Sequence, residues 1–468
     1  MTIVRAQAGL ARPAGQEPAP SRRPGLALLL AAAFFLLALG AYFLDVRVHT
    51  RHHMLTWFDL GVYNDAGGLV RHTPGQLYTW RLAPSVKFTY TPFAGVLFAG
   101  TSMLAWPVLR WSMTILSLVA VPLTGWLTFG AMGWQGSRRA AASLAVGAAG
   151  LWTEPVQRAL HLGQIEPALM LLVVWDLCQP DSRWWKGAGI GLAAGIKLVP
   201  LIFIPYLLLA GKWRQAAVAA AAFGVSAGIG FAALPKVSAD YWLTGYFLRP
   251  GNTGSVGGPV NQSLLGFLTR IIGTLTAAHP VWLVVAVITG VLGLSAAALL
   301  HRSGWPVQGW VLCALTGVLV SPISWDHHWV WILPVLAVGV DWAYRARRDL
   351  RWTVLALTAA VWGLFGGWPG RFTGPWAFIP EGLLGFFVNA YPKPPPGRPA
   401  GLPPLHASAA ALYRQVISSP LQHVSLPHVW DLRGIQLLSW NLFVLAGMAI
   451  YAALTAAAVI AWRARRRA

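Results

Sequence analysis

Charged residues and cysteine are the kinds of residue that this sequence has least of. Only 10% of its 468 residues are Asp, Glu, Lys or Arg, while 56% are hydrophobic, a balance that excludes an ordinary soluble globular protein. The two cysteines, Cys178 and Cys313, both lie in hydrophobic runs and form no metal-binding or disulfide pattern. The composition therefore predicts an all-α polytopic membrane protein and indicates no redox compartment.

Sequence signs of nucleotide and nucleic-acid binding are also absent. The sequence has neither a P-loop nor a dinucleotide-binding fingerprint. Its net charge of +21 comes from basic residues in short clusters between apolar runs, which fits membrane topology better than a basic face for nucleic acid. The 26 tryptophans suit both the headgroup level of a bilayer and stacking against sugar rings. We expect membrane lipids as partners and no nucleic acid.

Twelve hydrophobic runs have roughly the length that crosses a bilayer. The first, from Gly25 to Leu44, is longer than the apolar core of a signal peptide, so it is predicted to remain as an uncleaved span. Together the runs predict a helical bundle of about 12 transmembrane or re-entrant helices with external loops. The other eleven lie at 91–109, 111–131, 140–152, 163–178, 187–210, 215–234, 280–300, 307–323, 329–344, 352–366 and 437–461.

The polar intervals divide the chain into one membrane domain and two tails. Residues 1–24 are predicted to be a disordered cytoplasmic tail, 25–462 a single integral membrane domain, and 463–468 a basic cytoplasmic tail. The segment from Tyr391 to Pro396 is rich in proline and is predicted to be stiff and extended. None of the external loops is long enough for a separate soluble domain; they are expected at about 45–90, 235–279 and 367–436.

Basic residues set the predicted orientation of the spans. Arginines before the first span put the N-terminus in the cytoplasm and Asp59 outside, by the positive-inside rule. Strict alternation of the spans then puts Arg138-Arg139 and the segment from Arg183 to Lys186 outside, against the same rule. An alternative returns Arg183 and Lys186 to the inside by treating three pieces as re-entrant, namely 140–152, 187–197 and 200–210. We favour this alternative, although the sequence leaves both open.

An acidic residue among aromatic ones follows the first span. Asp59 lies in the stretch Trp57-Phe58-Asp59-Leu60-Gly61-Val62-Tyr63. At the rim of the bilayer it would be partly desolvated, which raises the pKa of a carboxylate and makes it a better proton acceptor. We therefore take Asp59 as a candidate catalytic base. From these residues alone, a helix cap or an interfacial pairing with Lys or Arg is the alternative.

Two adjacent histidines stand beside a carboxylate between two later spans, in the stretch from Ser321 to Trp329 that contains Asp326, His327 and His328. Such a group can bind metal, transfer protons or hold an anionic phosphate. Consecutive side chains at a helix entry point in different directions, so we expect no metal to be held by both imidazoles. The alternative is a helix cap by Ser324 or Asp326, with the imidazoles at headgroup level.

A lysine interrupts the apolar run 187–210. Lys197 precedes Pro200 by three residues, and a lysine inside a span marks a functional site unless its amine snorkels to the interface. Pro200 breaks the helix, which would let Lys197 and freed backbone groups face an anionic ligand. Weaker polar signals that could hydrogen-bond sugar hydroxyls are Glu154, His161, Gln164, Glu166, Asn261 and Gln262.

Seven short motifs occur along the chain, namely Phe58-Asp59-Leu60-Gly61-Val62-Tyr63, Gln76-Leu77-Tyr78, Phe88-Thr89-Tyr90-Thr91-Pro92, Gly163-Gln164, Ile196-Lys197-Leu198-Val199-Pro200, Asn261-Gln262-Ser263-Leu264 and Ser321 to Trp331. Taken together, these motifs resemble those of glycosyltransferase family 87, the polyprenyl-phosphate-mannose-dependent α-mannosyltransferases. No single motif is specific, but they occur in the order expected for the family. The chain departs from the family at Thr91, where a proline is frequent, and at Glu166, where Asn is frequent.

The resemblance implies a GT-C fold and mannose transfer at the extracytoplasmic face of the cell membrane. The donor would be a polyprenyl-phosphate sugar and the acceptor a glycolipid, either a phosphatidylinositol mannoside or lipomannan. Inversion at the anomeric carbon would give an α-(1→2)-type linkage, and no cofactor or metal is expected. Asp59 would be the base, and Lys197, His327 and His328 would bind the donor phosphate. The expected substrate-binding residues are Tyr63, Lys87, Tyr90, Gln164, Asn261, Gln262, Trp325 and Asp326.

Two other functions are compatible with parts of the sequence. A lysine beside a proline break is also how transporters and lipid flippases build binding sites. That class spreads polar residues through the depth of the membrane, whereas here they collect at one face. An arabinofuranosyltransferase that uses a lipid-linked donor would share the fold and the base, and would differ only in the shape of its pocket.

Overall fold

The computed structural model describes residues 24–49, 55–80, 87–249, 256–367, 437–438 and 440–467. Within these ranges the chain forms α-helices and short 3-10 helices, with two isolated bridges in place of any β-sheet. The predicted all-α class is therefore confirmed. Nearly all of the predicted tail 1–24 and of the loop 367–436, including the proline-rich segment, lies outside the described residues.

Five helices in the described part of the chain are long and apolar enough to cross a membrane. They confirm the first predicted run and four of the later ones. A sixth candidate is a bent pair, α7 (Glu154–Leu162) and α8 (Glu166–Leu177), whose axes differ by 118°. The five are α2 (Pro24–His49), α5 (Trp106–Ala131), α11 (Trp213–Ala233), α14 (Leu275–Arg302) and α21 (Leu442–Arg467).

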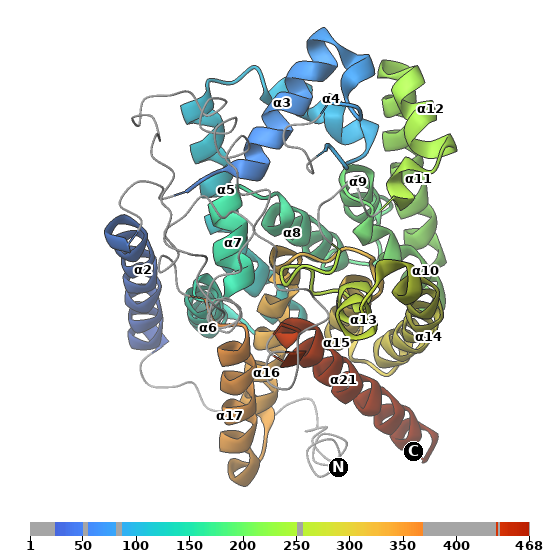
Figure 1. Ribbon diagram of the computed structural model, residues 1–468. Helices are drawn as coiled ribbons and strands as arrows, with labels where there is room; N and C mark the ends of the chain where they lie inside the picture. The colour runs from blue at the N-terminus through green and yellow to red at the C-terminus, as the bar shows by residue number, and fades with distance from the viewer. Residues whose placement is uncertain are drawn as a thin grey trace.

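Shorter helices fill the space between these spans. Figure 1 shows α7 and α8 in the middle of the bundle and α2 at its edge. The shorter α-helices are α3 (Phe58–His72), α4 (Pro92–Thr101), α6 (Gly136–Leu151), α9 (Ala188–Ile196), α10 (Phe203–Leu209), α12 (Pro235–Leu243), α13 (Leu264–Ile272), α15 (Pro306–Val320), α16 (Ile332–Arg345) and α17 (Arg348–Leu364). The 3-10 helices are η1 (Pro74–Gln76), η2 (Val199–Ile202), η3 (Tyr246–Leu248) and η5 (Asp326–Trp331).

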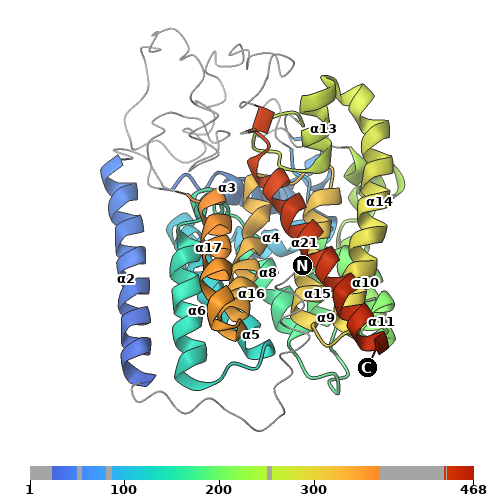
Figure 2. The ribbon, with the colours of Figure 1, turned by 90° about the horizontal axis from the view of Figure 1, so that it is seen from below.

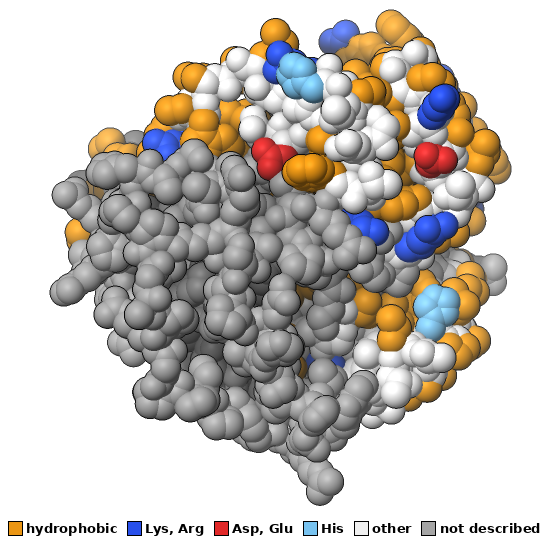
Figure 3. All heavy atoms as spheres, turned by 45° about the horizontal axis from the view of Figure 1, so that its top comes forward, with side chains coloured by type: hydrophobic (Ala, Val, Ile, Leu, Met, Phe, Trp, Pro, Cys, Tyr) orange, Lys and Arg blue, Asp and Glu red, His pale blue; other side chains and the backbone are white. Residues whose placement is uncertain are grey.

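Aliphatic side chains cover the outside of the bundle. On α14, Val284, Val287 and Val291 are each about three-fifths exposed, at 61%, 63% and 60%, and they recur at helical spacing on one face. In water such a face would be a large apolar patch, but hydrocarbon solvates it without cost. Figure 3 shows hydrophobic side chains over much of the part of another face that is not drawn grey. The exposed apolar surface is thus a lipid-facing one.

Two predicted spans have a different form in the structure. The run 91–109 divides between α4 and the start of α5, because Ser102 to Ala105 are not helical. The run 140–152, predicted as a re-entrant piece, instead belongs to the 16-residue helix α6, which lies side by side with α2 in Figure 2. Small residues of α6 pack against its neighbours: a Cβ at Gly147 would contact Pro122 of α5 and Phe35 of α2.

The run 187–210 breaks near its middle, as predicted. Helix α9 ends at Ile196, and Lys197 has extended backbone (φ −138°, ψ 129°) before the chain turns through η2 into α10. Lys212, after α10, then bonds to Asp181, which precedes α9, over 2.6 Å. The two halves of the run therefore start and end at the same level, which agrees with the re-entrant alternative.

Basic residues gather at one end of the bundle. Arg345 Nη2 donates to the carbonyl of Met132 at the α5–α6 connection (2.7 Å), and Arg465 donates to the carbonyl of Arg302. Arg214 donates to the carbonyl of Arg183 over 2.7 Å. In Figure 2 the α5–α6 connection and the C-terminus lie on the same side of the bundle. Arg138 and Arg183 thus share an end with Arg302 and Arg345, and strict alternation of twelve spans was wrong for them.

A buried arginine fixes the loop segments at the opposite end. Arg270 of α13 is 2% exposed and donates to the carbonyls of Gly258 (2.7 Å) and Asn261 (3.0 Å) and to Asn441 Oδ1 (2.8 Å). Arg270 therefore joins the segment that contains Gly258 and Asn261, before α13, to Asn441, which immediately precedes α21. That first segment pairs in turn with residues 324–326, because Gln262 N donates to the carbonyl of Ser324 over 2.7 Å.

We predict that Arg270→Met destabilises the protein by about 3 kcal/mol, because two buried carbonyls and a buried amide lose a charged donor. Thermal unfolding in detergent should begin several degrees lower than in wild type. The exposed Arg351→Met, on α17, serves as the control and should leave the transition unchanged. Equal unfolding temperatures for both variants would contradict the structural role of Arg270.

Candidate active site

Asp59 stands in the first turn of α3, at a strained entry to the helix. Trp57, which precedes α3, has φ 46° and is the one residue other than glycine with positive φ among the described residues. Its amide donates to the carbonyl of His161 (2.9 Å) and its indole Nε1 donates to Thr114 Oγ1 (3.1 Å). The strained backbone is thereby tied to α7 and α5, as is common where a site requires a fixed direction of approach. The half-buried Asp59 is directed toward the α7–α8 bend.

The α7–α8 bend carries the first partner of Asp59. Gly163 ends α7 with φ 68°, and a Cβ there would lie 2.8 Å from Leu60 Cβ, so glycine satisfies both the turn and the close packing. The next residue, Gln164, is buried and donates from Nε2 to Asp59 Oδ2 over 2.5 Å. The bend therefore brings an amide donor to the carboxylate.

Two tyrosines fix which way the Gln164 amide faces. Gln164 Oε1 accepts from the hydroxyl of Tyr63 (2.5 Å) and lies 3.3 Å from that of Tyr90, and the two hydroxyls are 2.7 Å apart. Because hydroxyl groups donate to the amide oxygen, the amide NH₂ is left to face Asp59. Tyr63 lies one helical turn after Asp59, and its ring stacks on Phe98 with centroids 4.6 Å apart.

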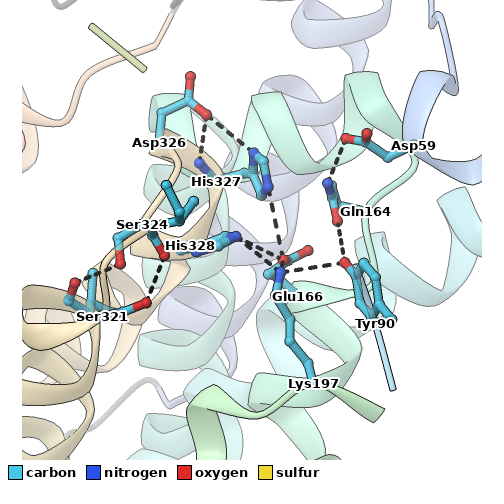
Figure 4. Close-up of polar contacts among 12 residues, drawn as sticks. Asp59, Tyr90, Gln164, Glu166, Lys197, Ser321, Ser324, Asp326, His327 and His328 are labelled. Carbon is cyan, nitrogen blue, oxygen red and sulfur yellow. Dashed lines mark hydrogen bonds and ion pairs between the residues drawn. The ribbon is translucent and has the colours of Figure 1, made fainter. Parts of the chain in front are cut away.

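Lys197 and Glu166 continue the polar network, as Figure 4 shows. The ammonium of Lys197 pairs with Glu166 Oε1 and lies 3.4 Å from the hydroxyl of Tyr90 and 3.0 Å from His328 Nε2. Thr91 supports this position by capping α4 and by donating its hydroxyl to the carbonyl of Gly195, just before Lys197. Thr91, which stands where the family frequently has proline, therefore joins α4 to the break in the run 187–210 through its hydroxyl.

The histidine pair enters from η5. His327 Nδ1 lies 3.2 Å from Asp326 Oδ1, and its backbone N–H donates to the same oxygen over 2.8 Å. Because an ionised carboxylate only accepts, the Nδ1 atom that faces Asp326 carries a proton. Arg158 of α7 lies 3.5 Å from the other oxygen of Asp326. His327 Nε2 is 3.9 Å and His328 Nε2 3.4 Å from Glu166 Oε1.

Burial and neighbouring charges set the ionisation of this site. Burial raises the pKa of the Asp59 carboxyl to about 6, while the His327 ring and the Gln164 amide limit the rise. For Asp326 burial also favours the neutral form, but Arg158 and His327 outweigh it and lower the pKa. Burial, together with Lys197 and His327, holds the pKa of His328 well below its ordinary value. Asp326 is therefore ionised and His328 neutral at pH 7.

Some of the predicted residues lie away from this network. Asn261 and Gln262 are fully buried and use both ends of their amides within the protein: Asn261 Oδ1 accepts from Ser324 N (2.9 Å), and Gln262 Oε1 accepts from Phe443 N (3.0 Å). They hold η5 and α21 in place and offer no amide group to a sugar. Trp325 is half-buried and pairs with Asn261 through its backbone, and Lys87 is half-buried at the head of the segment leading to α4.

The structure brings together eight of the predicted residues from five parts of the chain. They are Asp59, Tyr63, Tyr90, Gln164, Lys197, Asp326, His327 and His328. Glu166 was a weak signal in the sequence, yet it lies at the centre of the group. Arg158 was not anticipated, although a charged residue within the apolar stretch before Gly163 is itself a signal. Glu166, His327 and His328 offer three ligand atoms within 4.8 Å of one another, a spacing compatible with a metal ion. The expectation that the two adjacent imidazoles would point away from one another was therefore wrong.

Sequence comparisons give the family of the chain. Residues 88–322 match the family model described as glycosyltransferase family 87. In Mycolicibacterium smegmatis, a polyprenol-phosphate-mannose-dependent alpha-(1-2)-phosphatidylinositol pentamannoside mannosyltransferase is 32% identical over 361 residues, which are 73% of this chain and 83% of the relative.

Two further relatives carry a related name, polyprenol-phosphate-mannose-dependent alpha-(1-2)-phosphatidylinositol mannoside mannosyltransferase. The one from Mycobacterium tuberculosis H37Rv is 32% identical over 308 residues, 63% of this chain and 70% of the relative. The one from Mycolicibacterium smegmatis is 32% identical over 372 residues, 75% of this chain and 81% of the relative. No solved structure matches the chain significantly. The family match and these relatives together establish that the chain is a membrane glycosyltransferase of glycosyltransferase family 87.

Proposed function

We propose that this glycosyltransferase moves mannose from a polyprenyl-phosphate-mannose donor to a phosphatidylinositol mannoside acceptor and forms an α-(1→2) linkage. The names of the relatives support the donor, the acceptor and the linkage. The observation that carries the mechanism is the bond between Gln164 Nε2 and Asp59 Oδ2. It occupies one carboxylate oxygen of a half-buried acid and leaves the other to accept a proton from an acceptor hydroxyl.

Asp59 acts as the general base in a single displacement. It accepts the proton of the acceptor hydroxyl while that oxygen forms a bond to the anomeric carbon of mannose. The bond from the anomeric carbon to the phosphate oxygen breaks at the same time, and its electron pair leaves with polyprenyl phosphate. Attack from the side opposite the phosphate inverts a β-linked donor to an α-linked product. A pKa of about 6, raised by burial, keeps Asp59 mostly ionised at pH 7 while making it a stronger base than an Asp in water.

The ammonium of Lys197 stabilises the charge that grows on the leaving phosphate. It is 19% exposed and so is accessible to a ligand while mostly removed from water. The two histidines, expected to bind this phosphate, have different roles in this proposal. His328 is neutral and accepts from Lys197, which holds the ammonium in place.

His327 Nε2 and Glu166 Oε2 are buried polar atoms without a hydrogen-bond partner within the described protein. A buried polar atom is costly unless a ligand satisfies it. A hydroxyl group both donates and accepts, so hydroxyl groups of the transferred sugar can bond to both atoms, whereas an ionised phosphate oxygen cannot donate to Glu166. We therefore assign His327 to sugar recognition. This assignment favours a hydroxyl-rich pyranose over a lipid without sugar.

The orientation in the cell membrane follows from the basic end of the bundle. Arg302 and Arg345 lie at one end of α15 and α16, and Ser321 to Trp331 connect the other ends. By the positive-inside rule the basic end is cytoplasmic, so the Asp59 site faces the extracytoplasmic side of the plasma membrane. A donor with its prenyl tail in the bilayer can present its phosphate at that level without a nucleotide-binding loop.

We predict that Asp59→Asn lowers mannose transfer by about 10²- to 10⁴-fold, because the amide keeps the shape of the side chain but cannot accept the proton. The measurement is transfer of radiolabelled mannose from polyprenyl-phosphate mannose in membranes with matched protein levels. Asp65→Asn, on the same helix α3, is the control and should retain transfer. Retained transfer by a well-expressed Asp59→Asn protein would remove Asp59 from the role of base.

We also predict an acid limb in the pH profile of kcat/KM, since Asp59 must be unprotonated to act as a base. In wild type the rate should fall as the pH drops through about 6. Gln164→Leu removes a donor that stabilises the carboxylate, so the limb should move to higher pH. If the acid limb of Gln164→Leu falls at the same pH as that of wild type, Gln164 does not position Asp59 or change its pKa.

A further inference from the structure

The ammonium of Lys197 has an acceptor for each of its three protons. It pairs with Glu166 Oε1, lies 3.0 Å from His328 Nε2 and lies 3.4 Å from the hydroxyl of Tyr90. The ammonium is also 5.1 Å from the centre of the Tyr90 ring, within range of a cation–π contact. A lysine ammonium has three donors and no acceptor, so this group is coordinated as completely as a bound cation.

The groups around the ammonium are those that bind transition metals. Glu166 supplies a carboxylate oxygen, and His327 and His328 each supply Nε2, all three atoms lying within 4.8 Å of one another. Nδ1 of His327 is engaged by Asp326, and Nε2 of each ring is directed toward Glu166. Within the described ranges this is the only cluster of three such ligands. Two histidines and a glutamate are a common zinc ligand set.

The separations between these atoms fit a tetrahedral ion. Glu166 Oε1 is 3.4 Å from His328 Nε2 and 3.9 Å from His327 Nε2. Two ligands that each lie about 2.1 Å from a tetrahedral ion are about 3.4 Å apart, so only a small movement of His327 is needed. His327 Nε2 and Glu166 Oε2 are themselves buried without a hydrogen-bond partner, at 4% and 7% residue exposure. Figure 4 shows His327, His328 and Lys197 converging on Glu166.

We propose that Glu166, His327 and His328 form a divalent-cation site of the zinc and cobalt type, and that the ammonium of Lys197 fills this site in the native protein. The tethered lysine then supplies the positive charge that a metal ion would bring to the leaving phosphate. Glu166 positions the ammonium through the ion pair at its Oε1 atom, while its Oε2 atom stays available to a sugar hydroxyl. The cation site is independent of the proposed function; its use toward a donor phosphate rests on that function.

Another lysine–carboxylate pair in the chain is a matched comparison. Lys186 Nζ bonds to Asp181 Oδ1 over 2.8 Å at the basic end of the bundle, where Lys212 and Gln215 bond to the same carboxylate. Among the described residues, Asp181 belongs to no group of three metal-type ligands. Removal of Lys186 should therefore leave an ordinary surface carboxylate, whereas removal of Lys197 should leave a three-ligand metal site.

The experiment measures metal binding to purified protein in detergent, without any sugar substrate. Wild type, Lys197→Ala, Lys186→Ala and the double variant Lys197→Ala/Glu166→Gln are dialysed against Co²⁺ or Zn²⁺. Bound metal is determined by elemental analysis and by the visible absorption of Co²⁺. We expect Lys197→Ala to bind about one metal ion per chain. Wild type and Lys186→Ala should bind none, and the double variant should bind at least about tenfold more weakly than Lys197→Ala.

Three results would overturn the proposal. One is the absence of bound metal in a folded Lys197→Ala protein, and another is Co²⁺ binding by wild type equal to that of Lys197→Ala. The third is loss of wild-type mannose transfer after chelation with its return on adding metal, which would make the ion and not the ammonium the native cation. If Lys197→Ala does not fold, Lys197→Met replaces it, and the wild-type arms remain decisive. A failure of the proposed function would change transfer assays and leave the binding results as they are.

Discussion

The hydrogen bond from the Gln164 amide to the Asp59 carboxylate joins the two halves of the site. Asp59 belongs to α3, which follows the first span, whereas Gln164 belongs to the bend between α7 and α8 in the middle of the bundle. From Gln164 the network runs through Tyr63 and Tyr90 to Lys197, and from Lys197 to Glu166 and His328. Each member holds the next in a fixed orientation, so the proposed base and the proposed phosphate-binding cation are set relative to one another before substrate arrives.

The surrounding helices strengthen the interactions of these polar groups by keeping water away from them. Apolar helices exclude water from Glu166, His327 and Asp326, all less than a tenth exposed, so charges and hydrogen bonds there act in a low dielectric. The cost of burying them is offset in part by ion pairs, as in Arg158–Asp326 and Lys197–Glu166. The lipid-facing exterior contributes in a second way, because a donor with a prenyl tail can reach the site by lateral diffusion in the bilayer.

Much of the fold and of the candidate site could be predicted from the sequence. Long apolar runs gave α2, α5, α11, α14 and α21, since length and hydropathy alone determine such helices. Asp59, Lys197 and the histidine pair stood out because charged residues in an apolar chain are expensive. Other features could be recognised only in the three-dimensional structure. The splitting of 91–109 and the 118° bend after α7 depend on packing and on one glycine with positive φ. Likewise, Asn261 resembled a ligand in the sequence, and only its buried backbone contacts reveal a supporting role.

The central claim is that the Asp59 carboxylate accepts the proton of the attacking hydroxyl. Chemical rescue tests it most directly: Asp59→Gly leaves space for a small carboxylate, and mannose transfer is measured with increasing formate. The account predicts a rate at least about 10²-fold below wild type without formate, a rise in rate with formate concentration, and an α-linked product. A folded Asp59→Gly protein that transfers mannose at the wild-type rate with no formate present would contradict it.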